Sequence, residues 1–158
     1  MVRRIIVTVS LAALALTFAP AHAAGNTVCL LAGTAHFTPG AKLTAQTISY
    51  TFTGKLSSCS GTDKTAKSGS VTASGKGKFS CASGPSAGTA TIRWNNGKTS
   101  GLSFTANNTA ALVRLGGHVN SGLYAGANIT GLIVFEANPV GCVAGLPSAN
   151  FNGAVRAA

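Results

Sequence analysis

Short runs of alternating apolar and polar residues recur along the chain from about residue 28 onward. The clearest is ISYTFTGKL, in which Ile48, Tyr50 and Phe52 fall on one face and serine or threonine falls on the other. A period of two is the signature of a half-buried β-strand. Clusters of Gly, Pro, Asn and Ser separate these runs, so about eight or nine strands are predicted, with little helix.

This pattern is typical of an all-β fold. The arrangement of short strands and turns favours either an antiparallel β-sandwich or a flattened barrel. No linker or shift in composition divides the chain, so residues 24–158 are expected to form a single β-domain. A length of about 135 residues is usual for one domain.

The stretch TIRWNNGKTS predicts one turn in detail. A two-residue turn ending at Gly97 would place Ile92 and Leu102 on opposite faces, because a slip of one residue inverts every side chain. A three-residue loop keeps both on one face and requires a positive φ at Gly97, as in a type I turn with a G1 bulge. This interpretation places Trp94 in the core, whereas the alternative leaves Trp94 exposed as a ligand platform.

The first 23 residues have the organisation of a secretory signal peptide. Arg3 and Arg4 precede an apolar run over residues 5–19, which is too short for a comfortable membrane span. Ala21-His22-Ala23 then has the small-x-small form of a cleavage site. We expect cleavage after Ala23 and secretion of the remaining chain.

All four cysteines follow this cleavage site, and an even number in an exported chain indicates two disulfides. The first two predicted strands should be antiparallel neighbours, which brings Cys29 near Cys59. A strand of about ten residues would hold Cys59 and Cys81 roughly 30 Å apart, whereas bridged Cα atoms lie about 4.4–6.8 Å apart. We favour Cys29–Cys59 and Cys81–Cys142. The alternative, Cys59–Cys81 and Cys29–Cys142, requires that strand to be short or bent.

Charged residues are few and mostly basic. The chain has 12 Lys and Arg against two acidic residues, a formal net charge of +10, which falls to +8 without the signal peptide. The candidate binding residues are Trp94 and five closely spaced lysines, namely Lys55, Lys64, Lys67, Lys76 and Lys78. These lysines either protect an edge strand and maintain solubility or bind an anionic cell-envelope polymer or membrane surface. No aromatic residues are interleaved with them, which argues against specific nucleic-acid binding.

Residues suited to catalysis are scarce after the signal peptide. The acidic residues are Asp63 and Glu136, the histidines are His36 and His118, and no G-x-S-x-G motif occurs. We assign no catalytic residue, and we expect no metal site and no cofactor, because close Cys or His pairs are lacking. One alternative is a small secreted hydrolase, which needs a histidine beside a carboxylate in a pocket. Another is a secreted inhibitor or toxin-like factor, with ASGPSAG as its protruding loop.

Six short motifs carry a resemblance; in order they are GTAHFTPG, SSCSG, FSCASG, IRWNNGKTS, GHVNSGLYAG and GCVAGLPSANFNG. With these motifs in this order, the chain resembles a group of small exported actinobacterial four-cysteine β-proteins that have no assigned activity. The resemblance implies a bacterial, disulfide-bearing β-domain and assigns no site residues. The combined expectation is a secreted, basic, non-enzymatic protein that acts by surface contact at the cell envelope or in the medium.

Overall fold

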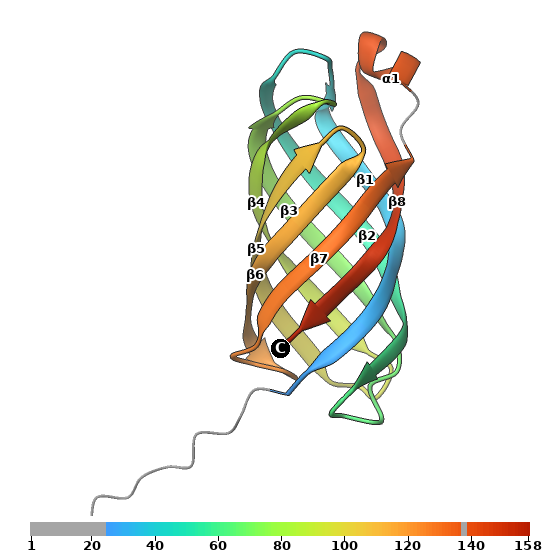
Figure 1. Cartoon of the computed structure of the whole chain (residues 1–158), viewed down its shortest axis with the longest axis vertical. Helices are drawn as coiled ribbons and strands as arrows, with labels where there is room; N and C mark the ends of the chain where they lie inside the picture. The colour runs from blue at the N-terminus through green and yellow to red at the C-terminus, as the bar shows by residue number, and fades with distance from the viewer. Residues whose placement is uncertain (1–24, 137–138) are drawn as a thin grey trace, which may run out of the picture.

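The computed structural model describes residues 25–136 and 139–158, and the predicted signal peptide with its cleavage site lies outside them. Eight antiparallel strands form a closed barrel in which each strand pairs with its neighbours in sequence and β8 pairs with β1 (Figure 1). The strands are β1 Thr27–Ala41, β2 Gln46–Gly61, β3 Gly69–Phe79, β4 Ser83–Trp94, β5 Thr99–Thr109, β6 Leu112–Gly122, β7 Asn128–Glu136 and β8 Leu146–Ala157. The short helix α1, Pro139–Ala144, precedes β8. No helix in the described part of the chain is long and apolar enough to cross a membrane.

The all-β prediction is confirmed, and the barrel is found rather than the sandwich. Closure comes from the pairing of β1 with β8, in which Cys29 lies opposite Val155 and Ala35 lies opposite Ala149. A closed sheet leaves no strand edge unpaired. Alternation along each strand then separates the two faces, so that Ile48 and Tyr50 are buried inside while the threonines and serines of β2 face outward.

The hairpin prediction is confirmed. Gly97 has a φ of 83°, and the Trp94 backbone N–H donates a hydrogen bond to the Lys98 carbonyl oxygen at 2.9 Å. Ile92, Trp94 and Leu102 all face the barrel interior. The three-residue loop therefore keeps both apolar sets on the buried face, as the pattern requires.

The favoured disulfides are also confirmed. Cys29–Cys59 joins β1 to β2, with Cα atoms 4.1 Å apart. Cys81–Cys142 joins the β3–β4 turn to α1, with Cα atoms 6.2 Å apart. Two disulfides are typical of proteins that fold in an oxidising, extracellular environment.

One sequence prediction is wrong: ASGPSAG does not form a protruding loop. Residues 83–88 begin β4 and all pair with β5, and residues 86–88 pair with β3 as well, so that Gly88 lies opposite Gly75 on β3 and Phe104 on β5. Small residues suit this position because a Cβ atom on Gly88 would lie 2.9 Å from Cζ of Phe104. The loop needed by the inhibitor alternative is therefore absent at this segment.

Candidate functional site

The barrel contains a cavity of about 390 Å³ at one end. This is the end that carries α1 (Figure 1). All eight strands contribute inward-facing side chains to it. Its lining is mostly phenylalanine and alanine, including every phenylalanine of the described residues: Phe37, Phe52, Phe79, Phe104, Phe135 and Phe151. The volume lies in the range of small-molecule sites, which are mostly apolar.

An aromatic layer forms the floor of this cavity. The Phe52 ring centroid lies 6.0 Å from that of Phe104 and 5.5 Å from that of Phe151. A second, smaller cavity of about 70 Å³ lies on the other side of the layer, and Phe52, Phe104 and Leu115 line both. These side chains therefore divide the interior into an open half near α1 and a packed half.

The cavity opens to solvent at the end of the barrel near α1, opposite the aromatic layer. Leu43, in the β1–β2 turn, lines the cavity and is 60% exposed. Ala82 in the β3–β4 turn and Ala110 and Ala111 in the β5–β6 turn also line it and are exposed. These turns and the Cys81–Cys142 disulfide form a rim around an opening.

Four polar side chains interrupt the apolar lining, and none of the lining residues is charged. Asn108 Nδ2 donates to the Ser80 carbonyl oxygen at 3.0 Å, and Ser80 Oγ donates to the Ser83 carbonyl oxygen at 3.2 Å, so both of these polar side chains have partners at the rim. Tyr50 is 8% exposed, and its hydroxyl has no hydrogen-bond partner among the described residues. Burial raises the pKa of Tyr50; the nearby Ser86 opposes the rise, although the two side chains fall short of hydrogen-bond geometry.

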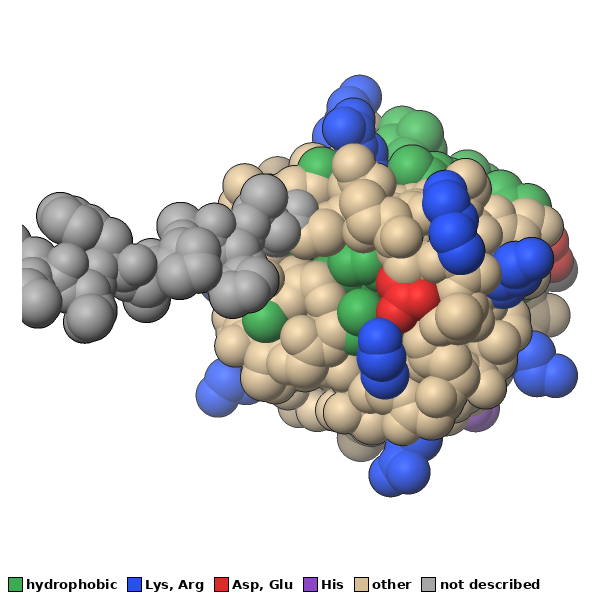
Figure 2. Space-filling model, turned by 90° about the horizontal axis from the view of Figure 1, so that it is seen from below, with side chains coloured by type: hydrophobic (Ala, Val, Ile, Leu, Met, Phe, Trp, Pro, Cys, Tyr) green, Lys and Arg blue, Asp and Glu red, His purple; other side chains and the backbone are tan. Residues whose placement is uncertain are grey.

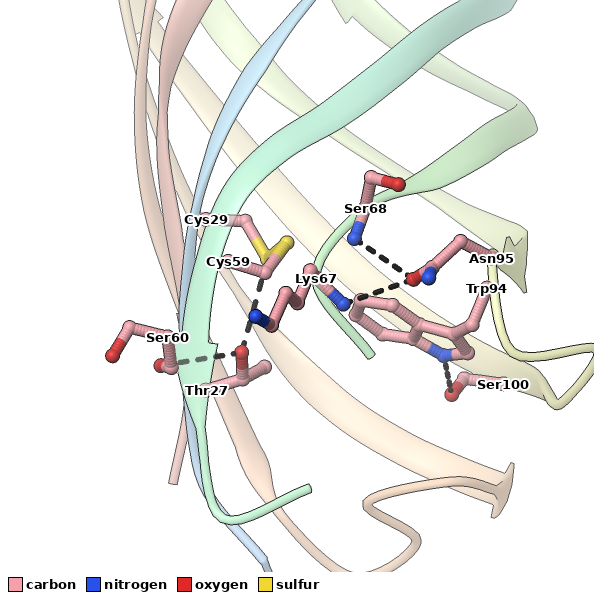
Figure 3. The surroundings of a disulfide bond; sticks show 9 residues. All are labelled: Thr27, Cys29, Cys59, Ser60, Lys67, Ser68, Trp94, Asn95 and Ser100. Carbon is pink, nitrogen blue, oxygen red and sulfur yellow. Dashed lines mark hydrogen bonds between the residues drawn. A yellow bond between two sulfur atoms is a disulfide. The ribbon is translucent and has the colours of Figure 1, made fainter. Parts of the chain in front are cut away.

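The opposite end of the barrel is closed by packing. The Trp94 ring meets the Tyr124 ring edge to face, with centroids 5.5 Å apart. Trp94 Nε1 donates to Ser100 Oγ at 2.8 Å (Figure 3), and Ser100 Oγ donates to the Leu123 carbonyl oxygen at 2.6 Å. Trp94 is 5% exposed, which contradicts the alternative in which it is an exposed ligand platform. The apolar surface of the Trp94 ring is buried inside the barrel, and its single N–H has a hydrogen-bond acceptor there.

Hydrogen bonds between loops cover this closed end. Asn95 Oδ1 accepts from the backbone N–H groups of Lys67 and Ser68 at 2.9 and 3.0 Å (Figure 3). Lys98 Nζ pairs with Asp63 Oδ2 at 2.8 Å, and this hydrogen bond, followed by that from Thr65, lowers the pKa of Asp63 far below its usual value. The turn between β4 and β5 thus anchors the loop between β2 and β3.

The five lysines of the predicted basic patch are exposed and lie on β2, β3 and the loop that joins them. Lys64 and Lys67 are at the closed end, whereas Lys76 and Lys78 lie in the half of β3 nearer α1. Lys76 is seven residues from the start of β3, or about 23 Å along the strand. Figure 2, which views the barrel from the end opposite α1, shows Lys and Arg side chains projecting separately around the perimeter. The five predicted lysines, Lys55, Lys64, Lys67, Lys76 and Lys78, therefore form an elongated strip on one side of the barrel and not a single cluster.

The residues of the hydrolase alternative are not brought together. His36 and His118 lie exposed on strands β1 and β6. Asp63 bonds to Lys98 and Thr65, and Glu136 accepts from Asn152 Nδ2 at 3.0 Å. Over residues 25–136 and 139–158, no hydrogen bond links a histidine to either carboxylate, and no group of three or more His, Cys, Asp or Glu side chains is placed to hold a metal ion.

No protein-family model, curated protein or solved structure matches this chain. The resemblance to exported actinobacterial proteins therefore stays a prediction, and the site is interpreted from its geometry. The cavity-lining phenylalanines could not be identified as site residues from the sequence, because inward phenylalanines are expected equally in a filled core. The sequence feature that could have indicated a cavity is the presence of small alanines at inward positions of the same half, such as Ala35, Ala106 and Ala149.

Proposed function

We propose that this protein is a secreted, non-enzymatic binder of small apolar molecules, which it holds in the open half of the barrel. The observation that carries the proposal is the open cavity of about 390 Å³ with an almost wholly apolar, uncharged lining. An apolar cavity holds water poorly and takes up apolar molecules in its place. Ligand transport or sequestration outside the cell fits such a protein.

The expected affinity follows from the area that a ligand can bury. A ligand that buries about 300 Å² of apolar surface gains about 7.5 kcal/mol. Part of this gain is offset by the loss of translational and rotational freedom. Dissociation constants in the micromolar range or weaker are therefore expected for probes that merely fill the space.

Binding of N-phenyl-1-naphthylamine, whose fluorescence rises in apolar surroundings, tests the proposal. Ala106→Phe places a ring in the cavity and should weaken binding at least about tenfold, since it removes space the probe needs. Ala87→Phe is the matched control, because Ala87 is exposed on the outer face of β4. Absence of binding by the parent, or equal binding by both variants, would show that the barrel interior is not the site.

A second candidate function rests on the strip formed by Lys55, Lys64, Lys67, Lys76 and Lys78. All five are exposed, and the one ion pair among the described residues, Lys98–Asp63, involves none of them. Unpaired cations on one side of the barrel favour association with an anionic envelope polymer or membrane surface. Both functions are compatible, since the cavity lies inside the barrel and the strip lies outside it.

A further inference from the structure

We infer that the ligand of the cavity is a neutral, largely hydrocarbon molecule with a single hydrogen-bond acceptor, such as a ketone or ester, that pairs with the Tyr50 hydroxyl. This inference rests on the proposed function, because it names the chemical class of the molecule bound at the same site. It starts from the one polar atom of the cavity wall that is buried and has no partner within the described residues, Tyr50 Oη.

The position of Tyr50 is set by a glycine on the neighbouring strand. A Cβ atom on Gly75 would overlap with Tyr50 Oη and would lie 2.6 Å from Tyr50 Cζ. The ring therefore lies across β3 where no side chain intervenes, and its hydroxyl comes near Ser86 on β4. Tyr50 and Ser86 together form a polar notch in an otherwise apolar wall.

The chemistry of this polar notch selects an acceptor. A buried hydroxyl without a partner is costly, because it has lost its bonds to water. The ordinary pKa of tyrosine, about 10, already keeps the phenol protonated at neutral pH, and burial raises the pKa of Tyr50 further, so its O–H is available to donate. A ligand carbonyl oxygen placed at the polar notch would remove the cost and fix the orientation of the ligand.

The same wall disfavours an ionised ligand. None of the residues lining the cavity is a Lys, Arg or His that could pair with a buried carboxylate. Transfer of an unpaired carboxylate into apolar surroundings is strongly unfavourable. The volume also sets a size: a cavity of 150 Å³ binds benzene, so 390 Å³ in proportion accepts about 16 non-hydrogen atoms.

Three matched probes test the inference by displacement of N-phenyl-1-naphthylamine. Benzophenone carries one carbonyl, diphenylmethane has the same two rings without it, and diphenylacetate carries a negative charge. The parent should bind benzophenone about 2- to 12-fold more tightly than diphenylmethane, the ratio that one neutral hydrogen bond provides. Diphenylacetate should bind most weakly.

Tyr50→Phe should abolish the preference for benzophenone and leave diphenylmethane binding intact, which also reports that the barrel remains folded. Tyr124→Phe is the matched control, since Tyr124 Oη is likewise buried without a partner among the described residues but lies at the closed end. A preference that survives Tyr50→Phe, equal binding of benzophenone and diphenylmethane by the parent, or tightest binding of diphenylacetate would overturn the inference while leaving the proposed function in place. Failure of all probes to bind the parent would overturn both.

Discussion

The two ends of the barrel are built from the same eight strands and differ in what fills them. At the closed end, Trp94 and Tyr124 pack against each other, and Ser100 satisfies the indole N–H. At the open end, inward positions carry alanines such as Ala35 and Ala149 between phenylalanine rings, and a cavity of about 390 Å³ remains. The strand framework alone therefore does not determine whether the interior is a core or a site; the sizes of inward side chains do.

The loops differ in the same sense. Backbone hydrogen bonds accepted by Asn95 Oδ1 and the Lys98–Asp63 pair join neighbouring loops at the closed end. At the open end, a covalent tether, Cys81–Cys142, holds α1 at the rim, and Leu43 remains largely exposed. The closed end is thus tightly packed and held by hydrogen bonds between its loops, whereas the end near α1 is less tightly packed and has an opening.

Truncation of the ring that fills the closed end should have the largest effect on stability. Trp94→Ala leaves a large void and removes the N–H from which Ser100 Oγ accepts, and it should lower the free energy of unfolding by about 3–5 kcal/mol. Phe37→Ala should cost about half as much or less, because Phe37 is only partly buried and already borders the cavity. Urea unfolding of both variants provides the measurement. Equal losses would mean that the open end is packed as tightly as the closed one.

Local patterns account for much of what the sequence predicted correctly. The period of two in β2 and the turn ending at Gly97 depend on neighbouring residues alone. The disulfide Cys29–Cys59 followed from the expected antiparallel pairing of two consecutive strands. In each case the decisive interaction lies within a hairpin, where the side-chain period and turn geometry are sufficient.

Closure and the cavity could not be predicted in this way. The pairing of β1 with β8 joins the two ends of the domain, so no local signal distinguishes it from the open edge of a sandwich. The segment 83–88 has the composition of a turn but forms strand, because its small residues leave room for inward rings such as Phe104. The polar notch depends on Tyr50, Gly75 and Ser86, whose proximity follows only from the strand register.

Removal of each disulfide should separate stability from ligand access. Replacing either pair of cysteines with alanine should lower the free energy of unfolding by about 2–4 kcal/mol. Only Cys81→Ala with Cys142→Ala frees α1 from the rim, so only this variant should release N-phenyl-1-naphthylamine faster. Stopped-flow dilution measures the rate, and Cys29→Ala with Cys59→Ala is the control. Faster release from the control instead would place the entrance at the other end.

A smaller effect is expected from acid at the closed end. The hydrogen bond from Lys98 holds the pKa of Asp63 below its ordinary value of about 3.9. A depressed pKa in the folded state means that ionised Asp63 favours folding above that ordinary value, and the contribution is lost as the pH falls toward the folded pKa. The parent should therefore lose more thermal stability than Asp63→Asn between about pH 4 and pH 2. Parallel pH profiles for both proteins would contradict this prediction and show that the Lys98–Asp63 pair does not stabilise the fold.

The smallest effect on stability is expected from the lysine strip, which spans both ends. Replacement of Lys64, Lys67, Lys76 and Lys78 by Gln should change the free energy of unfolding by no more than about 0.5 kcal/mol, because all four are exposed. Sedimentation with phosphatidylglycerol vesicles and with polyphosphate should nevertheless show weaker association for this variant. The parent's association should itself fall as salt shortens the screening length from about 30 Å at 0.01 M to about 8 Å at physiological ionic strength.

Replacing only Lys64 and Lys67, or only Lys76 and Lys78, by Gln then reports whether the closed end or the half nearer the cavity faces the anionic surface. If the four-Gln variant binds as well as the parent at every salt concentration, the lysines serve only solubility, and the cavity is the one binding site left of the two proposed.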